Sequence, residues 1–381
     1  MSDSSTSSVA NSQEAAAKGA LVKMAATGLV LIGIAAAGVF FTFQFAENER
    51  ERELKQWQIR LGIVADSRFA DIDGWLESQL GELNALAENQ SLQIYTDQLQ
   101  ELEDREAPSL EADSLNTLLA AVAERAGFKA EIKGSEIQAN VERVGVAGIG
   151  ILDKEGVPLV SSPGMPPMVG QLKAFVAATE KGERGVSNMF LNSSGNPAMA
   201  FLVPVFGVQG DQTASSQIAT IVGVKEIASE LYPLLKQPGN TDKSAETIIV
   251  RRKDSSVQYL TPRNDVNPPL KNDLTIDTPN LAAAFALDTP GGFGIKVDYQ
   301  DNEVLLTVRA FSQVPWSLIY KIDTAESLAE AENRIRTIVI AFIGIIVLVF
   351  IGLIAVWYKG SSTRATEAAT RFEALSQRFQ G

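Results

Sequence analysis

Two uninterrupted apolar segments lie near the two ends of the chain. "MAATGLVLIGIAAAGVFFTFQFA" (residues 24–46) has 23 residues without a charge, and "TIVIAFIGIIVLVFIGLIAVWY" (337–358) has 22. About 20 apolar residues suffice for a helix to cross a hydrocarbon core. We therefore predict two transmembrane helices, at residues 21–46 and 337–358.

A cleaved signal peptide is the alternative for the first segment. Its apolar run is longer than the roughly 7 to 15 residues typical of such peptides, and charged helix-forming sequence follows it directly. We therefore expect the segment to stay in the membrane as an anchor. Residues 1–20, before it, are rich in Ser and Ala without apolar periodicity, and we predict a disordered tail there.

A helical period follows the first span. Apolar residues recur there at steps of mostly three or four, with charges between them: Leu54, Trp57, Leu61, Val64, Ile72, Leu76, Leu80, Leu83 and Leu86. This spacing predicts a long amphipathic stalk helix over 47–107, broken near "NQS" at 89–91 and ended by Pro108. A shorter helix is expected over 114–127, with Ser114 as its N-cap and Gly127 as its stop.

From residue 144 the pattern changes to short strands. "VGVAGIGILDKEGVPLVSS" (144–162) predicts a strand, a turn and a strand, and 170–185 predicts a helix and a loop. "VSNMFLNSSGNPAMAFLVPVFG" (186–207) predicts a hairpin around a polar turn, and 218–235 predicts a strand that enters a helix. A polar linker, "KQPGNTDKSAE" (236–246), closes this first unit.

A similar order then recurs. Residues 247–263 predict a strand, a turn and a strand, 280–289 a short helix, and 294–323 three strands. We therefore predict an α+β fold with two tandem units, at 108–238 and 239–326. An exit helix at 327–336 leads to the second span.

The order of these segments resembles the double Cache domain, the tandem PAS-like extracytoplasmic sensor of bacterial chemoreceptors, histidine kinases and diguanylate cyclases. The resemblance rests on "GILDKEGVPLVSS", on the hairpin ending in Val-Pro-Val, on "TIVGVKEIASEL" and on "VPWSLIYKIDTAESLAEAENR". It covers about three quarters of the chain, and it implies two α/β units with antiparallel sheets behind a long stalk helix, flanked by two transmembrane helices.

The resemblance also implies that a small molecule binds in the membrane-distal unit, between the sheet and the elements covering one face. The matching candidates in this chain are Arg184, Asn188, Phe190, Phe201 and Lys225. Relatives that bind amines or amino acids often have Tyr near Phe190 and an acidic residue near Lys225, so this chain departs from their pattern and an amino-acid ligand is not expected there. A lysine on the pocket wall would favour an organic anion. Alternatively, Lys225 faces solvent at the sheet edge and the two phenylalanines are ordinary core residues.

Composition excludes several kinds of chemistry. The chain has no Cys and no His, so it lacks the usual nucleophilic thiol, the usual general base and the commonest zinc ligands. The paired acids, such as Asp298 and Asp301, lack the spacing of a calcium loop, and we expect them on solvated surfaces. We therefore predict no enzyme activity, cofactor or metal site. The net charge of −13 argues against nucleic-acid binding.

Charges near the spans predict the topology. Lys18, Lys23 and Lys359 lie beside the spans, and the intervening segment is long enough to be translocated regardless of its charge. We expect both termini in the cytoplasm and residues 47–336 in the periplasm of a bacterial inner-membrane protein.

The tail at 359–381 carries an apolar stripe typical of a signalling coiled coil, and its abrupt end favours the sensory half of a longer protein. Together these features predict a parallel homodimer that signals to a cytoplasmic output domain or partner. The alternative is a structural or partner-docking membrane protein that keeps the fold without a ligand.

Overall fold

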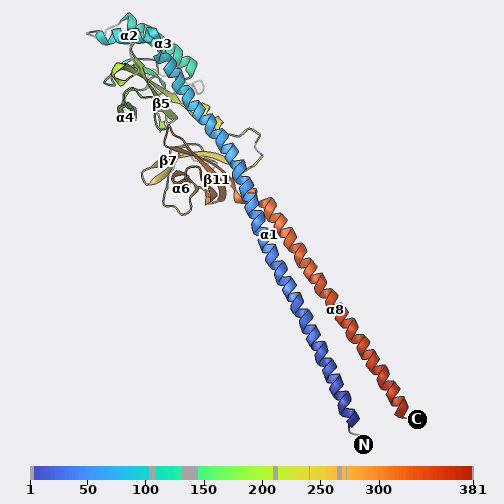
Figure 1. Ribbon diagram of the computed structural model, residues 1–381. Helices are drawn as coiled ribbons and strands as arrows, with labels where there is room; N and C mark the ends of the chain where they lie inside the picture. Colours follow the sequence, from blue (N-terminus) through green and yellow to red (C-terminus); the bar gives the residue numbers. More distant parts are fainter. Residues whose placement is uncertain are drawn as a thin grey trace. The chain divides into compact units, whose positions relative to one another are not determined.

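The computed structural model describes residues 4–102, 109–130, 145–208, 213–239, 241–263, 268–271 and 273–379. The chain forms two compact units. One combines Met1–Gln56 with Leu328–Gly381, and the other is Trp57–Ser327. Figure 1 gives the course of the chain and the element labels.

The first of these units consists of helical segments from the two ends of the chain. Helix α1 (Ser4–Ala87) begins within the segment expected to be disordered, where the run Ala15–Ala17 favours helix. Helix α8 (Ala329–Phe379) contains one segment, Ala329–Gly352, that is long and apolar enough to cross a membrane among the residues that were described. It overlaps the second predicted span. The first predicted span lies partly outside the described side chains.

Helices α1 and α8 touch within this unit. A Cβ placed on Gly38 would lie 2.0 Å from the ring of Phe342, so only glycine permits this approach. Arg334 pairs with Glu49 at 2.6 Å and with Glu53 at 3.5 Å. The two helices are therefore joined both by close packing and by ion pairs.

Helices also begin the larger unit. Helix α1 ends at Ala87, and α2 (Gln90–Glu101) starts after Asn89, whose side chain accepts from the amide of Leu92. The predicted break near 89–91 therefore lies where α1 ends and Asn89 caps the start of α2. Helix α3 (Leu110–Ala126) starts at Ser109 rather than at Ser114, because Ser109 caps the Ala112 amide. Gly127 ends it at φ 77°, as predicted.

The first sheet has six strands. They are β1 (Gly148–Leu152), β2 (Pro158–Ser161), β3 (Gly185–Val186), β4 (Phe190–Leu191), β5 (Pro197–Phe206) and β6 (Gln217–Glu226). Their order is β2-β1-β6-β5-β3, with β4 also paired to β5, and all pairs are antiparallel. Helices α4 (Gly170–Ala178) and α5 (Ala228–Leu234) and a short 3-10 turn (Ala214–Ser216) complete this part.

The second sheet follows the linker. It contains β7 (Glu246–Lys253), β8 (Ser256–Tyr259), β9 (Asp273–Thr275), β10 (Phe293–Val297), β11 (Glu303–Ala310) and β12 (Trp316–Asp323), with α6 (Ala282–Asp288) and the single turn α7 (Thr324–Ser327). Its order is β10-β11-β12-β7-β8-β9. In both sheets the last strand lies beside the first, so β2-β1-β6-β5 corresponds to β8-β7-β12-β11, and β9 adds an edge strand beyond β8. Two antiparallel sheets thus follow each other along the chain, and the bounds of the two predicted units stay a prediction.

Three hairpin turns are built in the same way. Asp153, Asn192 and Asp298 each accept, through one side-chain oxygen, from the amides two and four residues ahead. The residue three places ahead is left-handed in each turn, with φ between 66° and 81°. In each of the three turns, a short side chain therefore provides the hydrogen-bond acceptor for two backbone amides.

Each sheet packs on both of its faces. On the side of the first sheet that faces α1, Phe201 meets Trp75 and Phe128 edge to face, with ring centroids 6.0 and 6.2 Å apart. Helix α1 also reaches the second sheet, where Phe69 stacks on Phe311 at 4.7 Å. The opposite faces are covered by α4 and α6, which pack on separate apolar clusters.

Candidate functional site

The five residues predicted to bind a ligand are not gathered in one place. Phe190 packs with the apolar cluster under α4. Phe201, on the neighbouring strand β5, points to the opposite face and contacts Trp75 of α1. Successive strand residues alternate between faces, and the sequence did not show which face α1 covers. The two rings therefore belong to different sides of the sheet.

Lys225 lies on the α1 side and is buried. Its ammonium pairs with Glu230 at 2.7 Å and donates to Gln79 at 2.9 Å and to the carbonyl of Ala126 at 2.8 Å. It thus satisfies a carbonyl at the end of α3 and joins α1, α3 and α5. Lys225 is neither on the α4 side nor facing solvent, and these contacts give it a structural role.

Arg184 and Asn188 contact other parts of the chain, α1 and the second sheet. Arg184 lies 3.6 Å from Glu77 of α1, with both side chains about half exposed. The side-chain amide oxygen of Asn188 accepts from the Trp316 indole at 3.3 Å, and the backbone carbonyl of Met189 accepts from Arg251 at 3.0 Å. Asn188 therefore helps to hold the second sheet against the first. Ligand binding by any of these predicted residues stays untested.

The described interior between the first sheet and α4 is apolar. Its members are Leu152, Leu172, Ala200, Leu202, Val222 and Val224, with Met165, Met168, Phe175, Val176 and Phe190 packed against them. A Cβ at Gly148 would lie 2.7 Å from the Cα of Met165, so the loop before α4 fills the space over the sheet. A cavity of about 300 Å³ remains at the rim, where exposed lysines and acids alternate around it.

The second sheet carries charge at the equivalent place. In the first sheet Gly148, which opens β1, pairs with Val224 of the last strand. In the second sheet Glu246, which opens β7, pairs with Lys321 of the last strand. A position filled by apolar atoms in one repeat thus holds an ion pair in the other.

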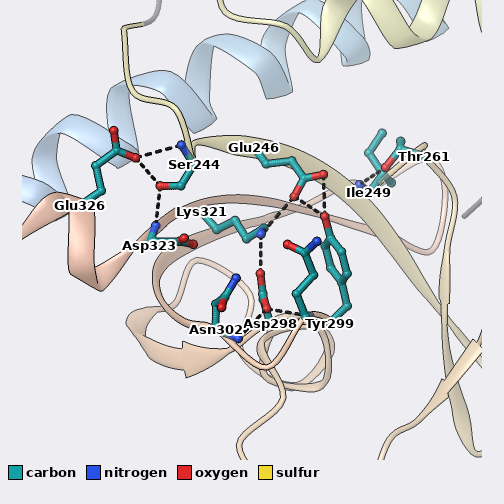
Figure 2. Close-up of polar contacts among 11 residues, drawn as sticks. Ser244, Glu246, Ile249, Thr261, Asp298, Tyr299, Asn302, Lys321, Asp323 and Glu326 are labelled. Carbon is teal, nitrogen blue, oxygen red and sulfur yellow. Dashed lines mark hydrogen bonds and ion pairs between the residues drawn. The ribbon is translucent and has the colours of Figure 1, made fainter. Parts of the chain in front are cut away.

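Figure 2 shows Lys321 between two carboxylates. Its ammonium lies 2.6 Å from Asp298 and 3.1 Å from Glu246, and the Tyr299 hydroxyl donates to Glu246 at 2.8 Å. The side chains of Lys321 and Asp298 are only 3% and 2% exposed. Charges as buried as these are stable only with partners, and here each has at least one. Asp298 was expected on a solvated surface; its burial corrects that prediction.

Aromatic rings extend the cluster. The Tyr259 and Tyr299 rings meet edge to face at 5.7 Å. The Arg263 guanidinium lies over both rings, 4.6 and 4.7 Å from their centroids, and Lys321 lies 4.8 Å from that of Tyr299. Stacking of this kind restricts the orientation of a guanidinium.

A cavity of about 380 Å³ lies beside this cluster. It is lined by α5 and the linker (Tyr232, Leu235, Lys236, Gln237, Asp242, Ala245), by β7 (Glu246, Thr247), and by Pro262, Arg263 and Tyr320. Burial raises the pKa of the Tyr232 phenol, which stays protonated and donates to the Leu260 carbonyl at 3.2 Å. Charged and aromatic side chains thus surround a space of ligand size.

The linker that lines the cavity also holds α7. The amides of Lys243 and Ser244 donate to the Glu326 carboxylate at 3.0 and 2.9 Å. Figure 2 shows the Ser244 contact together with the Asp323 amide, which donates to the Ser244 hydroxyl at 3.0 Å. The Ser244 hydroxyl and these amides lower the pKa of Glu326. Burial raises the pKa of Asp323, which the charge of Lys321 partly offsets.

A signal for this cluster is present in the sequence. Lys321 interrupts the apolar run of "WSLIYKID", and a lysine inside a strand that is otherwise buried requires an anionic partner. The sequence does not reveal which acid that is, because Glu246 and Asp298 lie 75 and 23 positions away. We had singled out Lys225, which interrupts a similar run but points to the other face.

Comparison with known proteins gives likenesses of structure only. No family model matches the sequence, and no curated protein matches it significantly. Solved structures similar to the chain include the extracellular domain of vpHK1S-Z8, a protein assigned to the histidine kinases. The two sequences are 14% identical and the TM-score is 0.45. The match covers 74% of this chain and 96% of that domain.

Two further similar structures are named sensor domains. The periplasmic sensory domain of the Campylobacter jejuni chemoreceptor Tlp1 has 13% identity and a TM-score of 0.42, covering 71% of this chain and 96% of the other. The sensor domain of the V. cholerae histidine kinase DctB has 13% identity and a TM-score of 0.40, covering 72% and 98%. Domains of this class were expected from the double Cache resemblance.

Proposed function

We propose that this chain is a bacterial inner-membrane sensor. Residues 47–336 form its periplasmic part, both termini are cytoplasmic, and two transmembrane helices anchor it. The tandem sheets bind a small molecule and pass a conformational change through α8 to a cytoplasmic output domain or partner. The chain itself catalyses no reaction in this proposal.

The contact between the linker and α7 carries the proposal. Glu326 accepts hydrogen bonds from Lys243 and Ser244, so the linker between the two sheets holds the turn that follows the last strand. Only Leu328 separates α7 from α8 along the chain. A ligand that binds one position of the linker better than another would shift α7 between two positions, and α8 would follow.

A parallel dimer through α1 completes the proposal. Ile59 and Ile63 are each 64% exposed on this helix, although both are apolar. Ala70, Gly74 and Gly81 continue the exposed face, and a Cβ on either glycine would meet nothing within 4 Å. A second copy of α1 would bury this stripe, with the small residues permitting close approach.

Disulfide crosslinking of the full chain in lipid nanodiscs tests transmission without a known ligand. The chain has no Cys, so Ser361→Cys provides one thiol per copy at the cytoplasmic tail. Adding Glu326→Ala releases α7, and we expect the crosslinking rate to change severalfold. Glu180→Ala, an exposed acid after α4, is the control. Equal rates in all three proteins would contradict the proposal.

The apolar interior under α4 favours a second candidate function. Met165 lies against Gly148, so the described residues leave little room for a ligand between this part of the sheet and the loop before α4. The chain would then be a partner-docking membrane protein that keeps the fold without a ligand. This candidate predicts no change at the tail when α7 is released.

A further inference from the structure

We propose that the cavity beside the Lys321 cluster binds a small carboxylate that carries a hydroxyl or ammonium group next to its carboxyl group. The inference rests on the proposed sensor function and names its ligand class. It places the ligand at the linker and the second sheet instead of in the first sheet.

Thr247 provides the first observation. It lines the cavity and is 7% exposed, and its hydroxyl has no hydrogen-bond partner among the described residues. A buried hydroxyl without a partner is destabilising, and such groups usually mark an unfilled contact.

Arg263 provides the cation. Its guanidinium lies over the Tyr259 and Tyr299 rings and lines the same cavity as Thr247. Contact with the two rings restrains the guanidinium, and a carboxylate matches the paired N–H donors of such a group. Lys236, also on the lining, adds a second positive charge.

The acids on the lining require more than a simple carboxylate. Asp242 and Glu246 line the cavity as well. Glu246 already accepts from Tyr299 and pairs with Lys321, so its charge is compensated, but its oxygens still favour a donor. A ligand with a hydroxyl or ammonium group beside its carboxylate offers a donor to these acids and an acceptor to Arg263.

The cavity suits a molecule of this size. A volume of about 380 Å³ lies within the usual range for small-molecule sites. The phenols of Tyr232 and Tyr320 donate to Leu260 and to Gln237, so their rings serve as fixed walls. Because Gln237 and Asp242 belong to the linker, a bound ligand would restrain the segment that reaches Ser244 and Glu326.

Calorimetric titration of the full chain in nanodiscs tests the inference, with L-lactate, L-alanine and propionate as probes. Propionate has the carboxylate without the neighbouring donor, and we expect L-lactate or L-alanine to bind at least about tenfold more tightly than propionate. Arg263→Gln should weaken that binding at least about tenfold. Thr247→Val should weaken it too, while leaving the unliganded fold as stable or more stable.

Arg252→Gln is the matched control, because Arg252 pairs with Asp288 on the surface, half exposed. Binding that Arg263→Gln leaves unchanged would overturn the inference, as would no heat from any probe, or propionate binding as well as L-lactate and L-alanine. If no probe binds but Glu326→Ala still alters tail crosslinking, only this inference fails. If a probe binds but Glu326→Ala has no effect on tail crosslinking, the site stands and the proposed function fails.

Discussion

The amide of Ser244 lies 2.9 Å from the carboxylate of Glu326, although 82 positions separate the two residues. This hydrogen bond joins the linker between the sheets to α7. Because α7 is followed almost directly by α8, a local contact at the linker has a short covalent route toward the apolar segment Ala329–Gly352. The predictions below test this connection and the packing around it.

The Glu326 contact should weaken in acid. Its pKa lies below the ordinary 4.5, because the ionised form accepts hydrogen bonds from Ser244 and Lys243. The contact is therefore fully stabilising above pH of about 4.5 and is lost as pH falls through the lowered pKa. Hydrogen exchange at the Ser244 amide, compared with Glu326→Gln at each pH, should show a protection difference that disappears in acid. A difference independent of pH would contradict this cause.

Removing the ammonium of the buried cluster should be strongly destabilising. Lys321→Met leaves Asp298 and Glu246 buried without their cation, and we expect a loss of about 3 to 5 kcal/mol in the free energy of unfolding. Lys253→Met is the control, since Lys253 is half exposed and pairs with Asp273 at 3.1 Å. Denaturant unfolding measures both. Equal, small losses would mean that the buried cluster is already compensated without Lys321.

Lys225 should prove structural. Lys225→Met removes its bonds to Glu230, Gln79 and Ala126, and we expect a loss of about 1 to 3 kcal/mol because Glu230 remains 38% exposed and can hydrate. Binding of L-lactate or L-alanine to the folded variant should be unchanged. Loss of binding with unchanged stability would return Lys225 to the ligand site.

The exposed face of α1 should control association. Ile59→Lys combined with Ile63→Lys places like charges on the proposed dimer contact, so the dimer fraction should fall. The midpoint of thermal unfolding should stay unchanged. Light scattering of the full chain in nanodiscs or detergent measures the change. Lys173→Glu, a change of an exposed charge on α4, serves as the control. A dimer that persists in the double variant would place its interface elsewhere.

The sequence predicted the fold well where local chemistry decides it. Asn89, Gly127 and the turns after Asp153 and Asn192 are local signals, and each marks a helix end or a hairpin. The nearly continuous apolar runs of β5 and β6 were predicted as strands, and both are buried along most of their length.

The sequence could not show which face α1 covers, because that depends on contacts far apart in the chain. Phe201 and Lys225 were therefore placed on the same side as Phe190, which the structure does not bear out. The pairing of Lys321 with Glu246 and Asp298 was missed for the same reason.

The most direct measurement is the rate of disulfide crosslinking at Ser361→Cys in nanodiscs, with and without saturating L-lactate or L-alanine. We predict that at least one of the two probes changes the crosslinking rate severalfold. This change should be absent in Arg263→Gln and retained in Arg252→Gln. An unchanged rate with the probe bound, as calorimetry shows it, would contradict the claim that this chain transmits ligand binding across the membrane.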